Sequence, residues 1–102
     1  MERQIEEKRE QVAELCRHYH VRRLALFGSA LRDDFDPQRS DLDFVVEFEP
    51  RPPGTYAKTY FGLLLALEQL FDRRVDLVEP DAVRNPYFRE EIEAQQETLY
   101  AT

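Results

Sequence analysis

The chain has 102 residues, with 21 Asp and Glu against 14 Lys and Arg, a formal net charge of −7 at pH 7. This length suffices for one small core and leaves no room for a separate substrate-binding domain, so residues 1–102 are expected to form a single domain. The acidic balance argues against direct binding to a nucleic-acid backbone and favours a protein partner.

Cysteine usage and hydropathy bear on the compartment. The single cysteine, Cys16, cannot form an intramolecular disulfide, and the first residues lack the apolar segment of a secretory signal. The densest apolar stretch, residues 61–67, is too short to span a bilayer. The sequence therefore predicts a cytoplasmic protein with no membrane partner.

Hydrophobic periodicity places the first elements. Apolar residues recur every three to four positions from Ile5 to Tyr19, which predicts an amphipathic helix covering one face of a sheet. Residues 21–27 predict a strand, because apolar side chains fall on both of its faces. The strand is expected to stop at Gly28. After a loop, a second strand is expected from about Asp41 to Phe48.

The second half of the chain starts with a proline-rich loop at residues 50–54. Residues 56–71 then predict a helix, and the aliphatic run 75–78 predicts a third strand. A last helix is expected to begin at Asn85-Pro86, with Asn as N-cap and Pro at the first position, and Leu99 is its furthest candidate member.

Two carboxylates stand one residue apart at the start of the second expected strand. The side chains of Asp41 and Asp43 therefore point to the same side of the sheet. Without a metal ion their repulsion would raise the pKa of one of them, whereas a divalent cation keeps both ionised. Asp76, in the third strand, is the candidate third carboxylate of a two-metal site.

Each of these acids also has a purely structural interpretation, in which it binds no metal ion and takes no part in catalysis. Ser40-Asp41 fits a capped turn, and Asp43 fits a solvated residue at a strand edge. An isolated acid such as Asp76 commonly lies on the solvated face of a short strand. The combination with Gly28-Ser29 favours a metal–nucleotide site, because a glycine-serine turn leading into a helix supplies backbone N–H groups for phosphate.

Two other kinds of metal site are disfavoured. Phe44, Val45 and Val46 follow Asp43 at positions where a calcium loop needs further oxygen ligands and a glycine. Zinc needs more nitrogen and sulfur ligands than two histidines and one cysteine near the first helix provide.

The motif Gly28-Ser29, then Ser40-Asp41-Leu42-Asp43, then Asp76 resembles the minimal nucleotidyltransferase (MNT) domain family of the DNA polymerase β-like superfamily. The resemblance covers most of the chain. Three further segments are similar to the MntA-like antitoxins of HEPN/MNT toxin–antitoxin systems: residues 24–32, 44–48 and 85–88.

The resemblance implies an α/β (α+β) fold, with a small mixed β-sheet flanked by helices. It also implies transfer of AMP from ATP to an acceptor hydroxyl, with release of pyrophosphate. Two bound Mg²⁺ ions, or Mn²⁺ in their place, would assist the reaction. In this subgroup the acceptor is typically a tyrosine of a HEPN toxin encoded alongside, which the modification neutralises.

Carried over by position, the resemblance assigns Asp41, Asp43 and Asp76 to the metal ions. It further implies that Asp76 helps to deprotonate the attacking hydroxyl. It also implies a nucleotide-binding set: Gly28, Ser29, Arg32 and Ser40. Gly28 would let the backbone approach the triphosphate, and Ser29 would hydrogen-bond a terminal phosphate oxygen.

One assignment and one loop stay open. Arg32 fits a group that offsets phosphate charge and equally fits a solvated helix arginine. Eleven residues, 30–40, separate Ser29 from Asp41, one more than the family's commonest spacing, and Asp33 replaces a frequent glycine. Surface loops tolerate such insertions, although an acid near phosphates is expected to weaken nucleotide binding.

The sequence leaves two functions in competition. One is the enzyme described above, and the other is a non-catalytic antitoxin that masks its partner by contact. Retention of all three acids favours the enzyme, because an acid cluster without a metal costs stability. Residues 61–67 of the helix 56–71 are apolar on all sides. Either the first and last helices cover this helix within the monomer, or it forms a homo- or hetero-oligomer. Nucleotide addition to RNA is disfavoured by the net charge.

Overall fold

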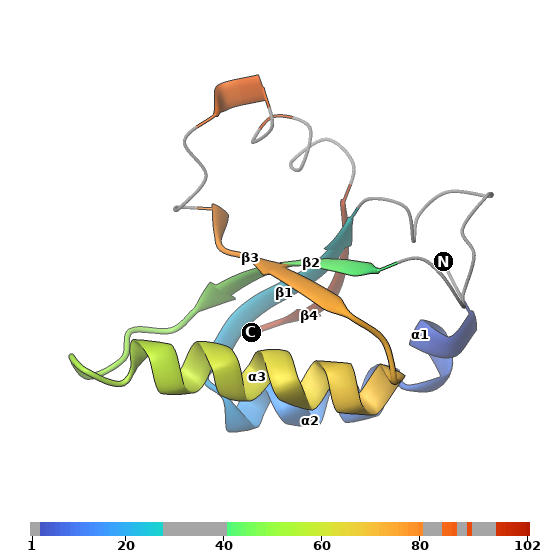
Figure 1. Ribbon diagram of the computed structural model, residues 1–102, viewed down its shortest axis with the longest axis horizontal. Coiled ribbons are helices and arrows are strands. Elements are labelled where there is room, and N and C mark those ends of the chain that lie inside the picture. Colours follow the sequence, from blue (N-terminus) through green and yellow to red (C-terminus); the bar gives the residue numbers. More distant parts are fainter. Residues whose placement is uncertain (1–2, 28–40, 81–84, 88–89, 91–95) are drawn as a thin grey trace.

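The computed structural model describes residues 3–27, 41–80, 85–87, 90 and 96–102 (Figure 1). The α/β fold that was expected, a small mixed sheet with helices, is confirmed. The elements are α1 (Arg3–Glu7), α2 (Arg9–His18), β1 (Val21–Phe27), β2 (Leu42–Phe48), α3 (Tyr56–Phe71), β3 (Val75–Val78) and β4 (Gln96–Ala101).

The strands form one sheet in the order β3-β2-β1-β4. Strand β1 pairs antiparallel with both β2 and β4, whereas β2 and β3 are parallel and are connected through α3. A parallel neighbour requires a crossover connection of this kind, and the 16-residue helix α3 supplies it.

The extension of the last predicted helix to Leu99 is wrong, because Leu99 lies in β4. In β4 only Leu99 is buried, and it packs into the core below the sheet. Strand β1 would otherwise present an unpaired edge, and pairing along that edge outweighs the weak helical periodicity of the segment. The predicted helix start is better placed: Asn85 Oδ1 accepts a hydrogen bond from the Tyr87 N–H at 3.0 Å.

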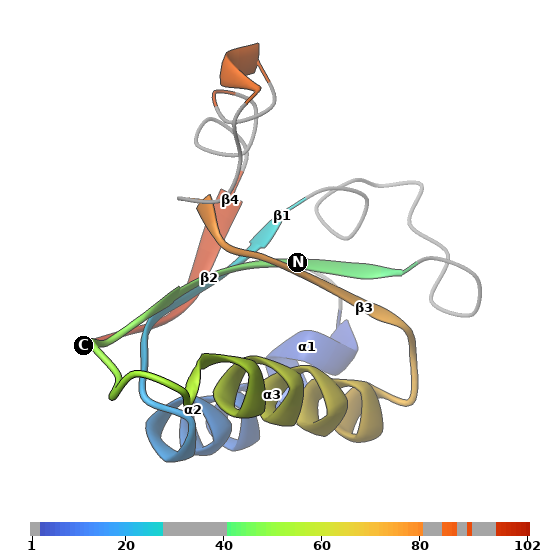
Figure 2. The same cartoon turned by 60° about the vertical axis from the view of Figure 1, so that its left-hand side comes forward.

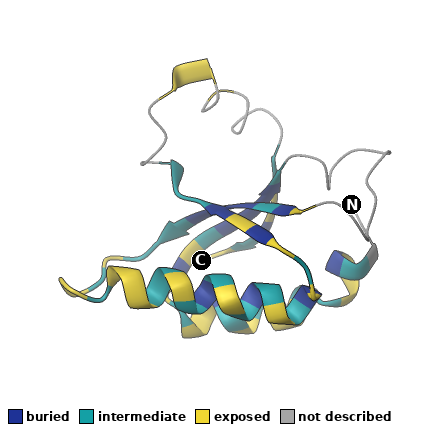
Figure 3. Cartoon of the chain, viewed as in Figure 1, coloured by how far each residue is buried: buried dark blue, intermediate teal, exposed yellow. Residues whose placement is uncertain are grey.

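Both long helices lie on the same face of the sheet (Figure 2). Helix α2 contacts β1 and β4, and α3 contacts β3. Buried residues, dark blue in Figure 3, occur on the strands and on the helices that pack against them. The largest fully buried side chains of this core are Ile5, Val12, Val21, Leu24, Leu26, Leu42, Phe44, Val46, Leu63, Leu67 and Phe71.

The N-terminal helical segment is broken at Lys8, where a single helix from Ile5 to Tyr19 was expected. The segment before the break covers the C-terminus of α3. Gln4 Nε2 donates to the Phe71 carbonyl at 3.3 Å, and Lys8 Nζ donates to the Leu70 carbonyl at 2.6 Å. These carbonyls have no partner within α3, so the break places α1 where it caps that helix.

Helix α3 divides into a core side and an outward side. Leu63 and Leu67 are fully buried, whereas Phe61 is 56% exposed and Leu65 is 57% exposed. The interpretation that other helices cover α3 on all sides is therefore wrong for Phe61 and Leu65. No helix in the described part of the chain combines the length and the apolar character needed to cross a membrane.

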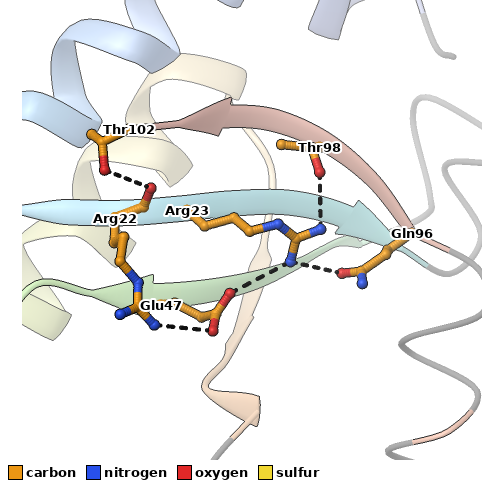
Figure 4. A network of polar contacts seen from close by, with 6 residues as sticks. All are labelled: Arg22, Arg23, Glu47, Gln96, Thr98 and Thr102. Atoms are coloured by element: carbon orange, nitrogen blue, oxygen red, sulfur yellow. Dashed lines mark hydrogen bonds and ion pairs between the residues drawn. The ribbon is translucent and has the colours of Figure 1, made fainter.

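A polar network connects the start of β1 to the neighbouring strands β2 and β4 (Figure 4). Arg23 donates to Gln96 Oε1 at 3.2 Å and to Thr98 Oγ1 at 2.9 Å, both on β4, and lies 3.6 Å from Glu47 Oε2 on β2. Arg22 forms a second ion pair with Glu47 at 3.4 Å. The guanidinium of Arg23 thus links β1 to both β2 and β4.

Cys16 is fully buried in the core, and burial raises the pKa of its thiol to about 12, an effect that the charge of Arg17 only partly opposes. The thiolate is the reactive form, so we expect no labelling of the native protein by a disulfide reagent at pH 8. One equivalent should react after unfolding in guanidinium chloride. Rapid labelling of the native protein would contradict the packing of α2 against the sheet.

Candidate active site

The parallel pairing of β2 and β3 places two of the predicted acids side by side. Asp43 and Asp76 are direct partners in the register of the two strands. Neighbouring strands lie about 4.8 Å apart, and residues opposite each other in register project to the same face. The residues that flank these acids, such as Leu42 and Leu77, pack into the core on the helix side. Both carboxylates therefore project from the other face.

Asp41 lies just before β2 and is exposed, two residues from Asp43. It is close enough for its charge to raise the pKa of Asp43. In the described part of the chain, no three His, Cys, Asp or Glu side chains form a group placed to hold a metal ion. The structure thus brings Asp43 and Asp76 together, with Asp41 beside them rather than in a closed three-ligand cluster.

The electrostatics of the pair follow from this geometry. The pKa of Asp43 is raised to about 6, first by burial and then by the charge of Asp76, a hydrogen bond with Asp76 and the charge of Asp41. The expected increase from repulsion between acids is therefore present, although burial is its largest cause and Asp76 contributes more than Asp41. A half-buried carboxylate with a second carboxylate beside it favours either a shared proton or a cation.

This shift predicts a pH-dependent stability of the metal-free protein. The unfolded-state pKa of an aspartate is about 3.9, so between roughly pH 4 and 6 the folded state binds more protons and stability falls as pH rises. Asp43→Asn should therefore raise the free energy of unfolding at pH 7.5 by about 1 kcal/mol, a figure already reduced for solvent screening. At pH 4 the gain should vanish. Chemical denaturation at both pH values in EDTA tests this, and an equal effect at both would contradict it.

A pocket of about 380 Å³ lies next to the acid pair. Asp43 and Asp76 line it together with apolar and aromatic side chains from β1, β3 and α3, among them Phe27, Tyr60 and Leu64. Tyr60 was not predicted from the sequence as part of the site. The signal that could have found it is its spacing of four residues from Leu64 and eight from Glu68, which puts the three on one stripe of α3.

Tyr60 is connected to the acids in two ways. Its hydroxyl donates to the carbonyl of Leu77, the residue after Asp76. The pKa of Tyr60 is raised by burial, and further by the charges of Glu79 and Asp76. At neutral pH Tyr60 is therefore a hydrogen-bond donor at the wall of the pocket.

The predicted nucleotide-binding residues Gly28, Ser29, Arg32 and Ser40 lie outside the described residues. The donor set that the structure does place consists of carboxylate oxygens. Such hard ligands suit Mg²⁺ or Mn²⁺, and a bound cation would remove the repulsion that raises the pKa of Asp43. The Asp43–Asp76 pair therefore fits a divalent cation.

Comparison with known proteins shows the family of this chain. Residues 8–98 match the family model described as "Nucleotidyltransferase domain". The chain is 35% identical over 75 residues to "Putative protein adenylyltransferase MJ1379" of Methanocaldococcus jannaschii, covering 74% of this chain and 73% of the relative. It is 33% identical to a solved structure named "putative minimal nucleotidyltransferase", with a TM-score of 0.74 and coverage of 91% and 90% of the two chains.

A more distant solved structure shares the fold. It is described as a tri-AMPylated HEPN toxin of Shewanella oneidensis in complex with an MNT antitoxin, with a TM-score of 0.65 at 19% identity, covering 95% of this chain and 72% of the other. The family match spans most of this chain, and the carboxylate pair stands at the edge of the matched sheet. The chain belongs to the nucleotidyltransferase domain family, as an enzyme of the minimal nucleotidyltransferase type.

Proposed function

We propose that this protein is a cytoplasmic antitoxin that transfers AMP from ATP to a hydroxyl, a tyrosine in particular, of a HEPN toxin and thereby neutralises it. The observation that carries the proposal is the register that places Asp43 opposite Asp76. The names of its relatives support AMP transfer to protein, and the toxin–antitoxin complexes among its structural neighbours support the choice of partner.

The acids would hold the cations and the acceptor. Asp43 and Asp76 would ligate Mg²⁺ together with Asp41, which reaches the same face of β2. Two bound ions would polarise the α-phosphate and lower the pKa of the acceptor hydroxyl. Asp76 is the exposed member of the pair, so it is the carboxylate that a side chain of a partner protein can reach. Its ionised oxygen would take the proton of the acceptor hydroxyl.

The reaction is a single displacement at phosphorus. The acceptor oxygen forms a bond to the α-phosphorus of ATP, the bond from that phosphorus to the bridging oxygen breaks, and pyrophosphate leaves. The backbone at Gly28 and the hydroxyls of Ser29 and Ser40 would hold the triphosphate, and Arg32 would offset its charge. These four roles are proposed from the resemblance of the Gly28-Ser29 and Ser40-Asp41 motif to the family alone.

A second candidate function is inhibition of the toxin by contact alone. The observation that favours it is the outward side of α3, where Phe61 and Leu65 are more than half exposed. This apolar surface suits a protein interface. That residues 56–71 mediate a homo- or hetero-oligomer remains a prediction, and it is compatible with either function.

The intact mass of the toxin separates the two functions. The HEPN protein encoded beside this chain would be incubated with the purified enzyme, ATP and Mg²⁺, and a parallel reaction would contain the Asp43→Asn variant. An increase of one or more AMP units with the wild type alone would establish the transferase. A stable complex and an inactive toxin without any mass change would contradict it and leave inhibition by contact.

A further inference from the structure

Strand β3 carries Asp76 but has few ladder contacts of its own. It is an edge strand of the sheet and pairs with β2 through four residues, 75–78. A slip by one residue would turn Asp76 to the helix side, and a slip by two would move it about 6.6 Å along β2. The pairing of Asp43 with Asp76 therefore depends on whatever fixes this register.

The outer edge of β3 is occupied by one stripe of α3. Tyr60, Leu64 and Glu68 are spaced four residues apart and so lie on one face of the helix. Glu68 Oε2 accepts the Val75 N–H at 3.2 Å, and the Tyr60 hydroxyl donates to the Leu77 carbonyl. Leu64, between them, lines the pocket next to β3.

The two hydrogen bonds flank Asp76 on both sides along the strand. They reach backbone groups that an edge strand leaves without a ladder partner. The short connection from α3 to β3 makes the arrangement local, because Asp72 ends the helix in a left-handed conformation and only two residues separate it from β3. Helix α3 thus takes the place of a further strand at this edge.

We propose that Tyr60 and Glu68 are positioning residues that fix the register of β3 on β2 and so keep Asp76 opposite Asp43. Neither side chain needs to touch a nucleotide for this role. The role of these side chains in keeping Asp76 opposite Asp43 is independent of the reaction. Its consequence for catalysis rests on the proposed function.

The hydrogen bonds of Tyr60 and Glu68 to the backbone of β3 are called the clamp below. The ends of β3 have further contacts, which do not replace it. The Leu42 N–H donates to the Arg74 carbonyl at 3.0 Å before the strand, and Arg51 approaches Glu79 to 3.8 Å after it. Both lie beyond the ends of β3. Only the contacts from Tyr60 and Glu68 bind the backbone within the strand itself, among those that side chains of the described residues form.

Hydrogen exchange of backbone amides tests the clamp without metal or nucleotide. In the double variant Tyr60→Phe/Glu68→Ala, amides of residues 76–78 and 42–45 should exchange about tenfold faster, because two hydrogen bonds are lost. Amides of β1 and β4 should exchange at wild-type rates once any change in the global free energy of unfolding is taken into account. The control Tyr56→Phe/Gln69→Ala alters the same helix at two exposed positions and should leave β3 unchanged.

A conservative variant separates the hydrogen bond from the charge. Glu68→Gln keeps an oxygen that can accept the Val75 N–H, so its β3 amides should exchange at wild-type rates, unlike those of Glu68→Ala. Wild-type exchange in the double variant would overturn the proposal. Equal acceleration in Glu68→Gln and Glu68→Ala would overturn it for Glu68.

Binding of Mn²⁺, followed by the loss of the free-ion EPR signal, connects the clamp to the acids. The double variant should bind Mn²⁺ roughly tenfold more weakly than the wild type and the control, as is typical when outer partners of metal ligands are removed. Unchanged affinity would contradict a role in placing Asp76. If the wild type bound no Mn²⁺, the proposed function would fail, and exchange alone would decide on the clamp.

Discussion

Replacing Asp43 or Asp76 by asparagine is expected to lower the rate constant for AMP transfer about a thousandfold. Each change removes a charged oxygen from the pair that the β2–β3 register brings together. Stabilisation of transition-state charge by bound divalent ions amounts to several kcal/mol, and about 4 kcal/mol corresponds to a factor of roughly a thousand. Single-turnover transfer of radiolabelled AMP to the toxin, at saturating ATP, measures this step directly.

The matched control for these variants is Asp72→Asn. Asp72 is an exposed aspartate in the left-handed conformation at the end of α3, a conformation that asparagine also adopts. It carries the same change of charge away from the pocket, so its rate should stay within a factor of two or so of the wild type. A transfer rate in Asp43→Asn that equals the Asp72→Asn rate would exclude the acid pair from the reaction.

Replacing Phe44 by alanine is expected to lower the free energy of unfolding by about 3–5 kcal/mol. Phe44 follows Asp43 on β2, is fully buried, and lies 6.2 Å from Phe71 between ring centroids. Removing it leaves a cavity between the sheet and the end of α3 that the surroundings fill only in part. Denaturation in urea, monitored by circular dichroism, gives the change.

Phe61→Ala is the comparison for Phe44→Ala. Phe61 loses the same atoms but is 56% exposed, and its contact with the Tyr60 ring, 5.1 Å between centroids, is edge-on. The expected loss is below about 1 kcal/mol. A loss as large as that of Phe44→Ala would mean that the outward side of α3 is covered in solution, as in an oligomer.

The strongly patterned elements could be predicted from the sequence. The apolar runs of 21–27 and 42–48, the helix at 56–71 and the short aliphatic strand at 75–78 were all predicted from local sequence patterns. Strand β4 could not be predicted, because its polar residues reflect an edge position that depends on β1, far away in the sequence. The break at Lys8 likewise depends on carbonyls at the end of α3.

The site shows the same division between local and long-range information. The proximity of Asp41 and Asp43 follows from their spacing along one strand. That Asp76 lies opposite Asp43 is a matter of register between strands, which the sequence could suggest only through family resemblance. Tyr60 and Glu68 were not predicted as part of the site, because their partners are backbone groups of β3. Their spacing places them on one stripe of α3 but does not show which strand that stripe contacts.

The most direct test of the central claim is a crystal structure with Mn²⁺ and a non-hydrolysable ATP analogue, recorded at a wavelength where manganese scatters anomalously. We expect an anomalous peak at the Asp43–Asp76 pair, with the phosphates of the analogue beside it. A nucleotide bound elsewhere, with no metal at this pair, would contradict the assignment of these acids.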